Sequence, residues 1–302
     1  MRILLFSDTH FSLASEPEDK VWWPFLVSKM PTKISKAYLA TWDKRASSAY
    51  KNMLRDAKNL GPYDLIISLG DNIHGTNERG MVNKKARFTW NIFCQHLENS
   101  FSLVPKKFVW GGHDVGFFNR FVKILSQFKL GWLLGAQNKS GMTKEAFKLA
   151  RETMGPPWQS FILERFTFLL LNSEVIRASF DAPDLETKDF ATRMIDEQFQ
   201  FISDNLKPAD KAIIVIHDPN VIRHLRNVIG SNAKKVALTL AGHFHLPLIG
   251  KIFGLQPFLR KLNFKVVPSP LGLELPFGCI KSRYRFCTLE ISGGIFNFNY
   301  HK

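Results

Sequence analysis

Short apolar runs alternate with longer amphipathic stretches along most of this chain. Continuous apolar runs of this length are typical of strands that are buried on both faces of a sheet. We therefore predict strands at 2–7, 64–69, 106–110, 166–172, 212–216 and 236–241. Apolar side chains at helical spacing predict helices at 43–59, 86–101 and 187–206. Strands that alternate with helices indicate an α/β fold with a central, largely parallel sheet.

The end of the chain has a different pattern, because apolar segments there follow one another without a helical stretch between them. "KVVPSP", "YRFCTLEI" and "IFNFNY" predict consecutive strands, which form an antiparallel edge or a second sheet. Three segments fit the alternation poorly and are interpreted as insertions, at about 11–42, 115–160 and 246–265. The chain has no internal repeat, so we expect one domain over residues 1–302.

The composition is that of an ordinary globular protein, with 45% hydrophobic and 22% charged residues. The cysteines Cys94, Cys279 and Cys287 are too few and too scattered for a disulfide framework or a cysteine metal site. The N-terminal segment turns polar after about five apolar residues, which predicts a strand and not a signal peptide. No apolar run approaches the roughly 20 residues of a membrane-spanning helix, and we expect a cytoplasmic protein.

The formal net charge of +15 arises mainly in residues 20–60, 115–165 and 246–283, which overlap the insertions. A local basic excess indicates a face for an anionic partner, either a membrane surface or nucleic acid. The segments 117–134 and 250–264 also mix Phe and Leu with lysines, which is typical of helices in a membrane interface. We expect peripheral contact with the inner face of a membrane. The alternative is a cap that packs over the cleft, with lysines that are merely solvated.

Aspartate and histidine residues directly follow five of the predicted strands. These residues are Asp8 and His10 in "SDTH", Asp71 in "LGDN", His113 and Asp114 in "GGHD", His217 in "VIHDP", and His243 and His245 in "AGHFH". An open α/β sheet gathers the carboxyl ends of its strands at one edge, where ligands bind. So many carboxylates and imidazoles in one cleft would repel one another or lose solvation, and bound divalent cations remove both costs.

The spacing within the motifs also favours metal binding. In Asp-x-His and His-x-His the outer side chains point to the same side of an extended backbone, so both can reach one ion. Carboxylate and imidazole donors without thiolate favour manganese, iron or zinc over a structural zinc site. Asp71 is suited to bridge two ions about 3.5–4 Å apart, an arrangement used in phosphate-ester hydrolysis.

The order of the five motifs resembles that of the calcineurin-like metallophosphoesterases, over residues 1–10, 62–114 and 160–245. The resemblance implies a layered sandwich of mixed β-sheets flanked by helices, with the insertions over the cleft. It also implies two divalent ions, with manganese preferred over iron, zinc or magnesium. One ion would be bound by Asp8, His10, Asp71 and His245, and the other by Asp71, His217 and His243.

The resemblance further implies catalytic roles for the "GGHD" motif. A metal-bound water would attack phosphorus, and His113 would protonate the leaving oxygen or stabilise its charge. Asp114 would orient the imidazole of His113. His74 and Asn72, in the motif that begins at Asp71, are weaker candidates for substrate binding, and a solvated loop histidine is an equal interpretation of His74.

The "GGHD" motif departs from the family at Gly112, where the family has an asparagine that binds the second metal. Glycine offers no side-chain oxygen, so the second metal site should be weakened. A water, a backbone carbonyl or Asn72 would fill the gap. An altered two-metal site, a one-metal enzyme and a non-catalytic scaffold, like the retromer subunit of this fold, remain open. The retention of every other ligand favours an enzyme.

The metal core does not distinguish a phosphomonoester, a phosphodiester or a pyrophosphate substrate. The amphipathic basic insertions favour an amphiphilic anionic substrate, as in the family members that cleave the pyrophosphate of UDP-diacylglucosamine. The alternative is a nuclease or nucleotide phosphodiesterase that uses the basic face for nucleic acid. The density of Phe and Leu in the insertions disfavours this alternative. The sequence does not indicate the oligomeric state.

Overall fold

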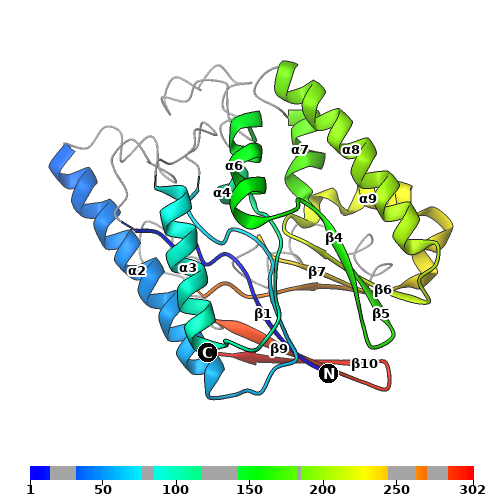
Figure 1. Cartoon of the computed structure of the whole chain (residues 1–302), viewed down its shortest axis with the longest axis horizontal. Coiled ribbons are helices and arrows are strands. Elements are labelled where there is room, and N and C mark those ends of the chain that lie inside the picture. The colour runs from blue at the N-terminus through cyan, green and yellow to red at the C-terminus, as the bar shows by residue number, and fades with distance from the viewer. Residues whose placement is uncertain (14–31, 76–84, 117–141, 182–184, 244–262, 271–284) are drawn as a thin grey trace.

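The computed structural model describes residues 1–13, 32–75, 85–116, 142–181, 185–243, 263–270 and 285–302. Within this part of the chain the strands form two five-stranded sheets (Figure 1). The first sheet has the order β10-β9-β1-β2-β3, and the second has the order β4-β5-β6-β7-β8. Both sheets are mixed, with a parallel centre and an antiparallel edge. The predicted fold class, a layered sandwich of mixed sheets flanked by helices, is confirmed.

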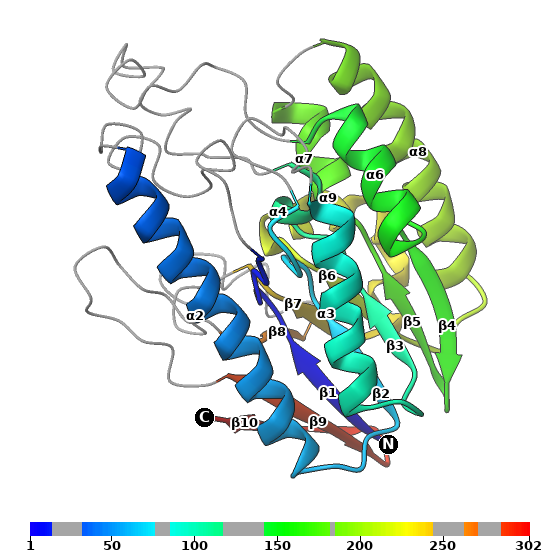
Figure 2. The ribbon, with the colours of Figure 1, turned by 60° about the vertical axis from the view of Figure 1, so that its left-hand side comes forward.

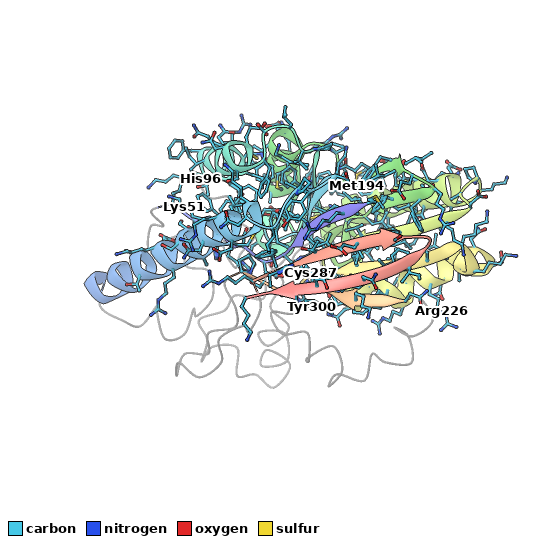
Figure 3. All side chains as sticks on the ribbon, turned by 90° about the horizontal axis from the view of Figure 1, so that it is seen from below. Lys51, His96, Met194, Arg226, Cys287 and Tyr300 are labelled. Atoms are coloured by element: carbon cyan, nitrogen blue, oxygen red, sulfur yellow. The ribbon has the colours of Figure 1, made fainter. Side chains whose placement is uncertain are left out.

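The first sheet combines both ends of the chain. Its strands are β1 (Arg2–Phe6), β2 (Leu65–Ser68), β3 (Lys106–Phe108), β9 (Phe286–Ser292) and β10 (Ile295–His301). β1, β2 and β3 are parallel, while β9 runs antiparallel to both β1 and β10. Cys287 of β9 lies opposite Tyr300 of β10, and Figure 3 shows the two strands side by side. The C-terminal strands therefore extend the N-terminal half of the molecule.

The second sheet is built from the later part of the chain. Its strands are β4 (Gln159–Leu163), β5 (Phe166–Leu170), β6 (Lys211–Ile216), β7 (Val236–Ala241) and β8 (Phe264–Val266). β4 and β5 form an antiparallel hairpin, and the other neighbours are parallel. β4 was not predicted, because its residues alternate between partly buried and exposed positions and lack a continuous apolar run.

The two sheets pack face to face through one set of side chains from each strand. One apolar cluster contains Ile3, Leu5 and Ile67 of the first sheet together with Phe168 and Ile213 of the second. The next residues along the strands, such as Leu4 and Ile214, belong instead to the cluster that contains the helices. This alternation is the two-residue period of a strand, applied to strands that are buried on both faces.

Helices cover the outer face of each sheet. α2 (Thr32–Lys58) and α3 (Ala86–Ser100) cover the first sheet, as Figure 2 shows. The second sheet is covered by α7 (Ser173–Asp181), α8 (Leu185–Leu206) and α9 (Ile222–Ile229). α6 (Lys144–Met154) packs against α3 and the short helix α4 (Gly112–Val115). None of the helices described combines the length and the apolarity needed to cross a bilayer.

The three predicted insertions lie largely outside the described residues. Where they are described they contain regular elements, because α2 begins at Thr32, eleven residues before the predicted helix, and α6 lies within 115–160. A side chain of Thr143 caps α6 by accepting a hydrogen bond from Ala146 N. The amphipathic segment 117–134 and residues 250–262 of the second segment lie outside the described residues, so their contact with a membrane stays a prediction.

Candidate metal centre

The carboxyl ends of β1 and β2 are hydrogen-bonded to each other beyond the last residues of the strands. Asp8 N donates to Gly70 O at 2.9 Å, and His10 N donates to Asp71 O at 3.0 Å. These bonds bring the side chains of Asp8, His10 and Asp71 into one group whose ligand atoms all lie within 4.8 Å of one another. All three side chains are buried. The two motifs that were predicted to share an ion therefore do meet.

The second sheet adds a second group of potential ligands on the other side of Asp71. His217 Nε2 lies 3.2 Å from Asp71 Oδ2, and His243 Nδ1 lies 3.2 Å from the same His217 nitrogen. Asp71, His217 and His243 form a group with ligand atoms within 4.8 Å of one another. Asp8 Oδ2 accepts a hydrogen bond from His243 N at 3.0 Å. Asp71 is thus common to both groups, as expected of a bridging carboxylate.

The orientation of His217 is set by a backbone carbonyl. Its Nδ1 lies 2.8 Å from Leu69 O. Because a carbonyl oxygen only accepts, Nδ1 must carry a proton, which leaves Nε2 as the atom able to bind a metal. Nε2 is the nitrogen that faces Asp71 and His243. This arrangement is the usual outer support of a metal-binding histidine.

Several residues of the candidate centre have a positive φ angle, which residues other than glycine rarely adopt. The φ angle is +54° at Asp8, +44° at His10, +51° at Asp71 and +67° at His243. Non-glycine residues at positive φ are uncommon, and such strained positions concentrate at functional sites. Four candidate ligands therefore share a backbone feature that the strand-and-helix pattern of the sequence does not reveal.

The first glycine of "GGHD" is required by a close approach. A Cβ atom at Gly111 would lie 2.2 Å from Asp71 N and 2.3 Å from Asp71 Oδ1, so no side chain fits there. Gly112 is the first residue of α4, and His113 N in this short helix donates to Asp71 Oδ1 at 2.8 Å. One carboxylate oxygen of Asp71 therefore holds the His113 backbone, while the other faces His217.

Asp114 fastens the loop after β3 to the loop after β2. Its carboxylate accepts hydrogen bonds from Gly111 N at 2.9 Å, from Ile73 N at 3.1 Å and from Asn72 N at 3.1 Å. Burial, with a smaller contribution from Asp71, raises the pKa of Asp114 to about 7, although the bonds from backbone N–H groups oppose this. The predicted orienting of His113 by Asp114 stays a prediction, and the observed bonds give Asp114 a bracing role.

Asn72 is buried and its side-chain amide is engaged on both sides. Nδ2 donates to Val109 O and to Asp114 Oδ2, each at 3.0 Å, and Oδ1 accepts from Ser68 Oγ at 2.5 Å. The two predicted roles of Asn72, in binding substrate and in replacing the ligand that Gly112 lacks, stay predictions. Thr9 Oγ1 adds a hydrogen bond to Asn72 O, which further fixes this loop.

The charges of the central groups are strongly interdependent. Burial opposes ionisation of Asp71, but the neighbouring imidazoles, led by His217, outweigh it and hold the pKa of Asp71 well below its usual value. Burial also opposes protonation of His217, yet the carboxylate of Asp71 raises the pKa of His217 well above its usual value. Burial lowers the pKa of His243. The carboxylate and imidazole donors fit a divalent cation, which would supply the positive charge that this buried cluster attracts.

His74 lies beside His10 and His113, with only 3% of its surface exposed. It is therefore not the solvated loop histidine that was an equal interpretation of the sequence. Burial lowers its pKa to about 4. His245 lies outside the described residues, so its role as a ligand stays a prediction.

A buried charged network that the sequence did not predict includes Asp218, the residue after His217. Arg177 Nη1 of α7 lies 3.1 Å from Asp218 Oδ2 and 3.3 Å from Glu174 Oε2. Asp218 directly follows His217, and its backbone N donates to Ser173 Oγ at 3.0 Å. Burial opposes ionisation of Asp218, but His243 and Arg177 hold its pKa at about 2. The available signal was the polar "NSE" after β5, from Asn172 on, which resembles the other polar strand ends.

Two mixed sheets packed face to face, with carboxylates and imidazoles where their strands end, define a metallophosphoesterase sandwich. The family model for calcineurin-like phosphoesterases matches residues 1–247, and the chain belongs to this family. The resemblance noted in the sequence is thereby confirmed. Family membership supports metal-dependent hydrolysis of phosphoester bonds as the class of reaction.

Among solved structures, the chain is similar to the purple acid phosphatase PPD1 from yellow lupin (Lupinus luteus) seeds, with a TM-score of 0.51 and 14% identity. That alignment covers 100% of this chain and 51% of the lupin chain, so this chain spans about half the length of that protein. A second similar structure is GAP50, the anchor in the inner membrane complex of Plasmodium, with a TM-score of 0.45, 13% identity and coverages of 99% and 84%. A search of curated proteins gave no match. The lupin likeness shows a shared fold.

Proposed function

We propose that this chain hydrolyses phosphoester or pyrophosphate bonds at a two-metal centre, with His245 as a further ligand. The described ligands are Asp8, His10, Asp71, His217 and His243. The observation that carries the proposal is the position of Asp71, which belongs to the ligand groups of both sheets. A shared carboxylate between two groups of donors is the arrangement that two-metal hydrolysis requires.

Divalent ions bound here would activate water and neutralise charge on the phosphoryl oxygens. Asp71 links this centre to the proposed acid, because its Oδ1 accepts from His113 N at 2.8 Å while its Oδ2 faces His217 at 3.2 Å. The imidazole of His113 is thereby held beside the ligands, where it protonates the leaving oxygen or stabilises its charge. Asp114 keeps the His113 loop in place through its bonds to Gly111 and Ile73.

Gly112 supports an unequal pair of metal sites. The amide of Asn72 is engaged by Val109, Asp114 and Ser68, which favours another donor in place of the missing oxygen. The group of Asp71, His217 and His243 is then completed by water or by a backbone carbonyl. We propose that this second site binds its ion more weakly and that manganese fills both sites. The alternative carried by Gly112 is a scaffold without catalysis.

We propose an amphiphilic phosphorylated substrate, presented at an anionic membrane surface. The support is the basic and aromatic composition of residues 117–134 and 250–264, since these segments combine Phe and Leu with lysines. A nucleotide or nucleic acid substrate is the alternative, and its support is the net charge of +15 alone.

The proposal is tested by manganese-dependent hydrolysis of bis(p-nitrophenyl) phosphate and p-nitrophenyl phosphate by the metal-stripped, reloaded protein. We expect the native protein to be active. His113→Ala should lower this activity by about 100-fold or more and still bind manganese, because it removes the proposed general acid. His224→Ala on α9 is the matched control. Absence of activity in the native protein, with activity in Gly112→Asn, would overturn the enzyme in favour of the scaffold.

The substrate class is tested separately. Sedimentation with vesicles of phosphatidylglycerol and phosphatidylcholine should remove the protein from solution, and with phosphatidylcholine alone it should not. Salt-sensitive binding to single-stranded DNA without binding to either vesicle would favour the nucleotide or nucleic acid substrate.

A further inference from the structure

Three histidines from three loops meet beside the ligand groups described above. His10 follows β1, His74 follows β2, and His113 lies in α4, beyond the end of β3 (Figure 2). One ring nitrogen of each lies within 4.8 Å of the others. The ring centroids of His10 and His113 are 4.6 Å apart, and His74 lies 5.1 Å from each of them. All three side chains are buried.

The loops that carry these histidines are hydrogen-bonded to one another. His74 N donates to Phe11 O at 3.1 Å, next to His10 in the chain. Gly75 N, next to His74, donates to His113 O at 3.0 Å. His10 N donates to Asp71 O, and His113 N donates to a carboxylate oxygen of the same residue. These bonds fix the three loops relative to one another, as a built metal site requires.

We propose that His10, His74 and His113 form a third metal position, made of imidazoles alone, that binds a borderline transition-metal ion such as Zn²⁺. Three histidines with a fourth position left open are a common donor set of open zinc sites. Imidazole suits zinc, copper, iron and nickel, whereas carboxylate-rich groups suit manganese and magnesium. The two ligand groups that contain Asp71 include carboxylate, and this group does not.

The new position interferes with the proposed catalytic centre. His10 belongs both to the histidine group and to the group of Asp8, His10 and Asp71, so ions in the two groups compete for one imidazole. An ion held by the histidine group also occupies His113, which the proposed function uses on the leaving oxygen. The inference rests on the proposed function only for this consequence, which is inhibition by zinc of the manganese-loaded protein.

The test measures metal binding without substrate, in an Asp71→Asn background. This substitution removes the carboxylate common to the other two groups and keeps an oxygen for His113 N. Equilibrium dialysis should show that Asp71→Asn binds Zn²⁺ and that adding His74→Gln weakens this binding by about 100-fold or more, since even an outer partner of a metal ligand is worth 10–100-fold. Adding His224→Gln instead should change nothing, because His224 lies on α9, stacked on Phe180.

A further variant separates a ligand from a structural residue. His74→Cys retains a zinc donor, so in the same background it should restore zinc binding. Bound Co²⁺, read by its visible absorption, should change spectrum when a thiolate replaces the imidazole. Equal zinc affinity with and without His74→Gln, or failure of folded Asp71→Asn to bind zinc, would overturn the proposal. If Asp71→Asn does not fold, the Co²⁺ spectra of His74→Cys and His74→Gln are compared in the otherwise native chain. A spectral change with the thiolate of His74→Cys then supports the site, and identical spectra overturn it.

Because no substrate is present, the result is independent of hydrolysis. The native chain could bind zinc through His74 and yet show no phosphoesterase activity. That result would overturn the proposed function, but the proposed zinc site would stand. If the protein binds zinc through His74 but zinc does not inhibit its activity, the proposed competition of two metal ions for His10 is wrong.

Discussion

Nε2 of His217 lies 3.2 Å from Oδ2 of Asp71, and this contact joins the ends of the two sheets. Asp71 follows β2 in the first sheet and His217 follows β6 in the second, 146 positions later in the printed sequence. The other carboxylate oxygen of Asp71 accepts from His113 N. A single buried carboxylate therefore contacts residues from both sheets, and its removal gives the sharpest test of the arrangement.

Asp71→Asn should lower manganese affinity and phosphoesterase activity by about 100-fold or more, because it removes a ligand from both groups and outer partners alone are worth 10–100-fold. The amide oxygen still accepts from His113 N, so the fold should be retained. Isothermal titration with Mn²⁺ and a circular dichroism spectrum check both statements. Asp56→Asn, on the surface helix α2, is a matched carboxylate control. Unchanged manganese binding by Asp71→Asn would contradict the shared ligand.

Manganese should stabilise the native chain against heat, since only the folded state brings the ligands together. An ion at 100 times its Kd contributes about 2.7 kcal/mol, which raises Tm by several degrees in a protein of this size. EDTA should reverse the rise, and Asp71→Asn should abolish it. Differential scanning fluorimetry with and without metal gives the answer. An equal rise in Asp71→Asn would place the stabilising ion elsewhere.

The positions of the candidate ligands were predictable because they depend on local pattern. Short apolar runs ending in Asp or His predicted β1, β2, β3, β6 and β7 and their polar ends. Parallel strands gather those ends at one edge, so the meeting of Asp8 with Asp71 also followed. The fold class was accessible for the same reason, since helix and strand periods are properties of the sequence itself.

Features that depend on contacts distant in sequence were not predictable. The positive φ of Asp71 and the hydrogen bonds of the Asn72 amide depend on contacts between loops, and no residue pattern predicts them. The ion pair between Arg177 and Asp218 joins α7 to the loop after β6. His74 fitted a solvated loop equally well until its position beside His10 and His113 was known.

Gly111→Ala should destabilise the protein and disable the centre, whereas Gly112→Ala should be tolerated. A Cβ at Gly111 would lie 2.2 Å from Asp71 N, and relief of such overpacking typically costs about 1–3 kcal/mol or more. Gly112 lies in the helix α4 and is not among the glycines with positive φ, so alanine fits its backbone. Urea unfolding of the two variants gives the comparison. Equal stability of Gly111→Ala and the native protein would show that the β2 and β3 loops separate easily.

Arg177→Met should be among the most destabilising single changes away from the ligands. It leaves the carboxylates of Glu174 and Asp218 buried without the guanidinium, and breaking a buried ion pair in this way costs about 3–5 kcal/mol. Arg87→Met is the matched control. The side chain of Arg87 is 63% exposed in its pair with Glu152, so that change should cost about 1 kcal/mol or less.

The cause of the Arg177 effect can be separated from lost packing. If uncompensated charge is responsible, adding Glu174→Gln and Asp218→Asn to Arg177→Met should restore much of the free energy of unfolding, because both carboxylates are then neutral. Asn at position 218 still caps the turn by accepting from Asn220 N. Urea denaturation of the single and triple variants measures the recovery. If the triple variant is no more stable than Arg177→Met, the guanidinium acts through packing and not by compensating the two carboxylates.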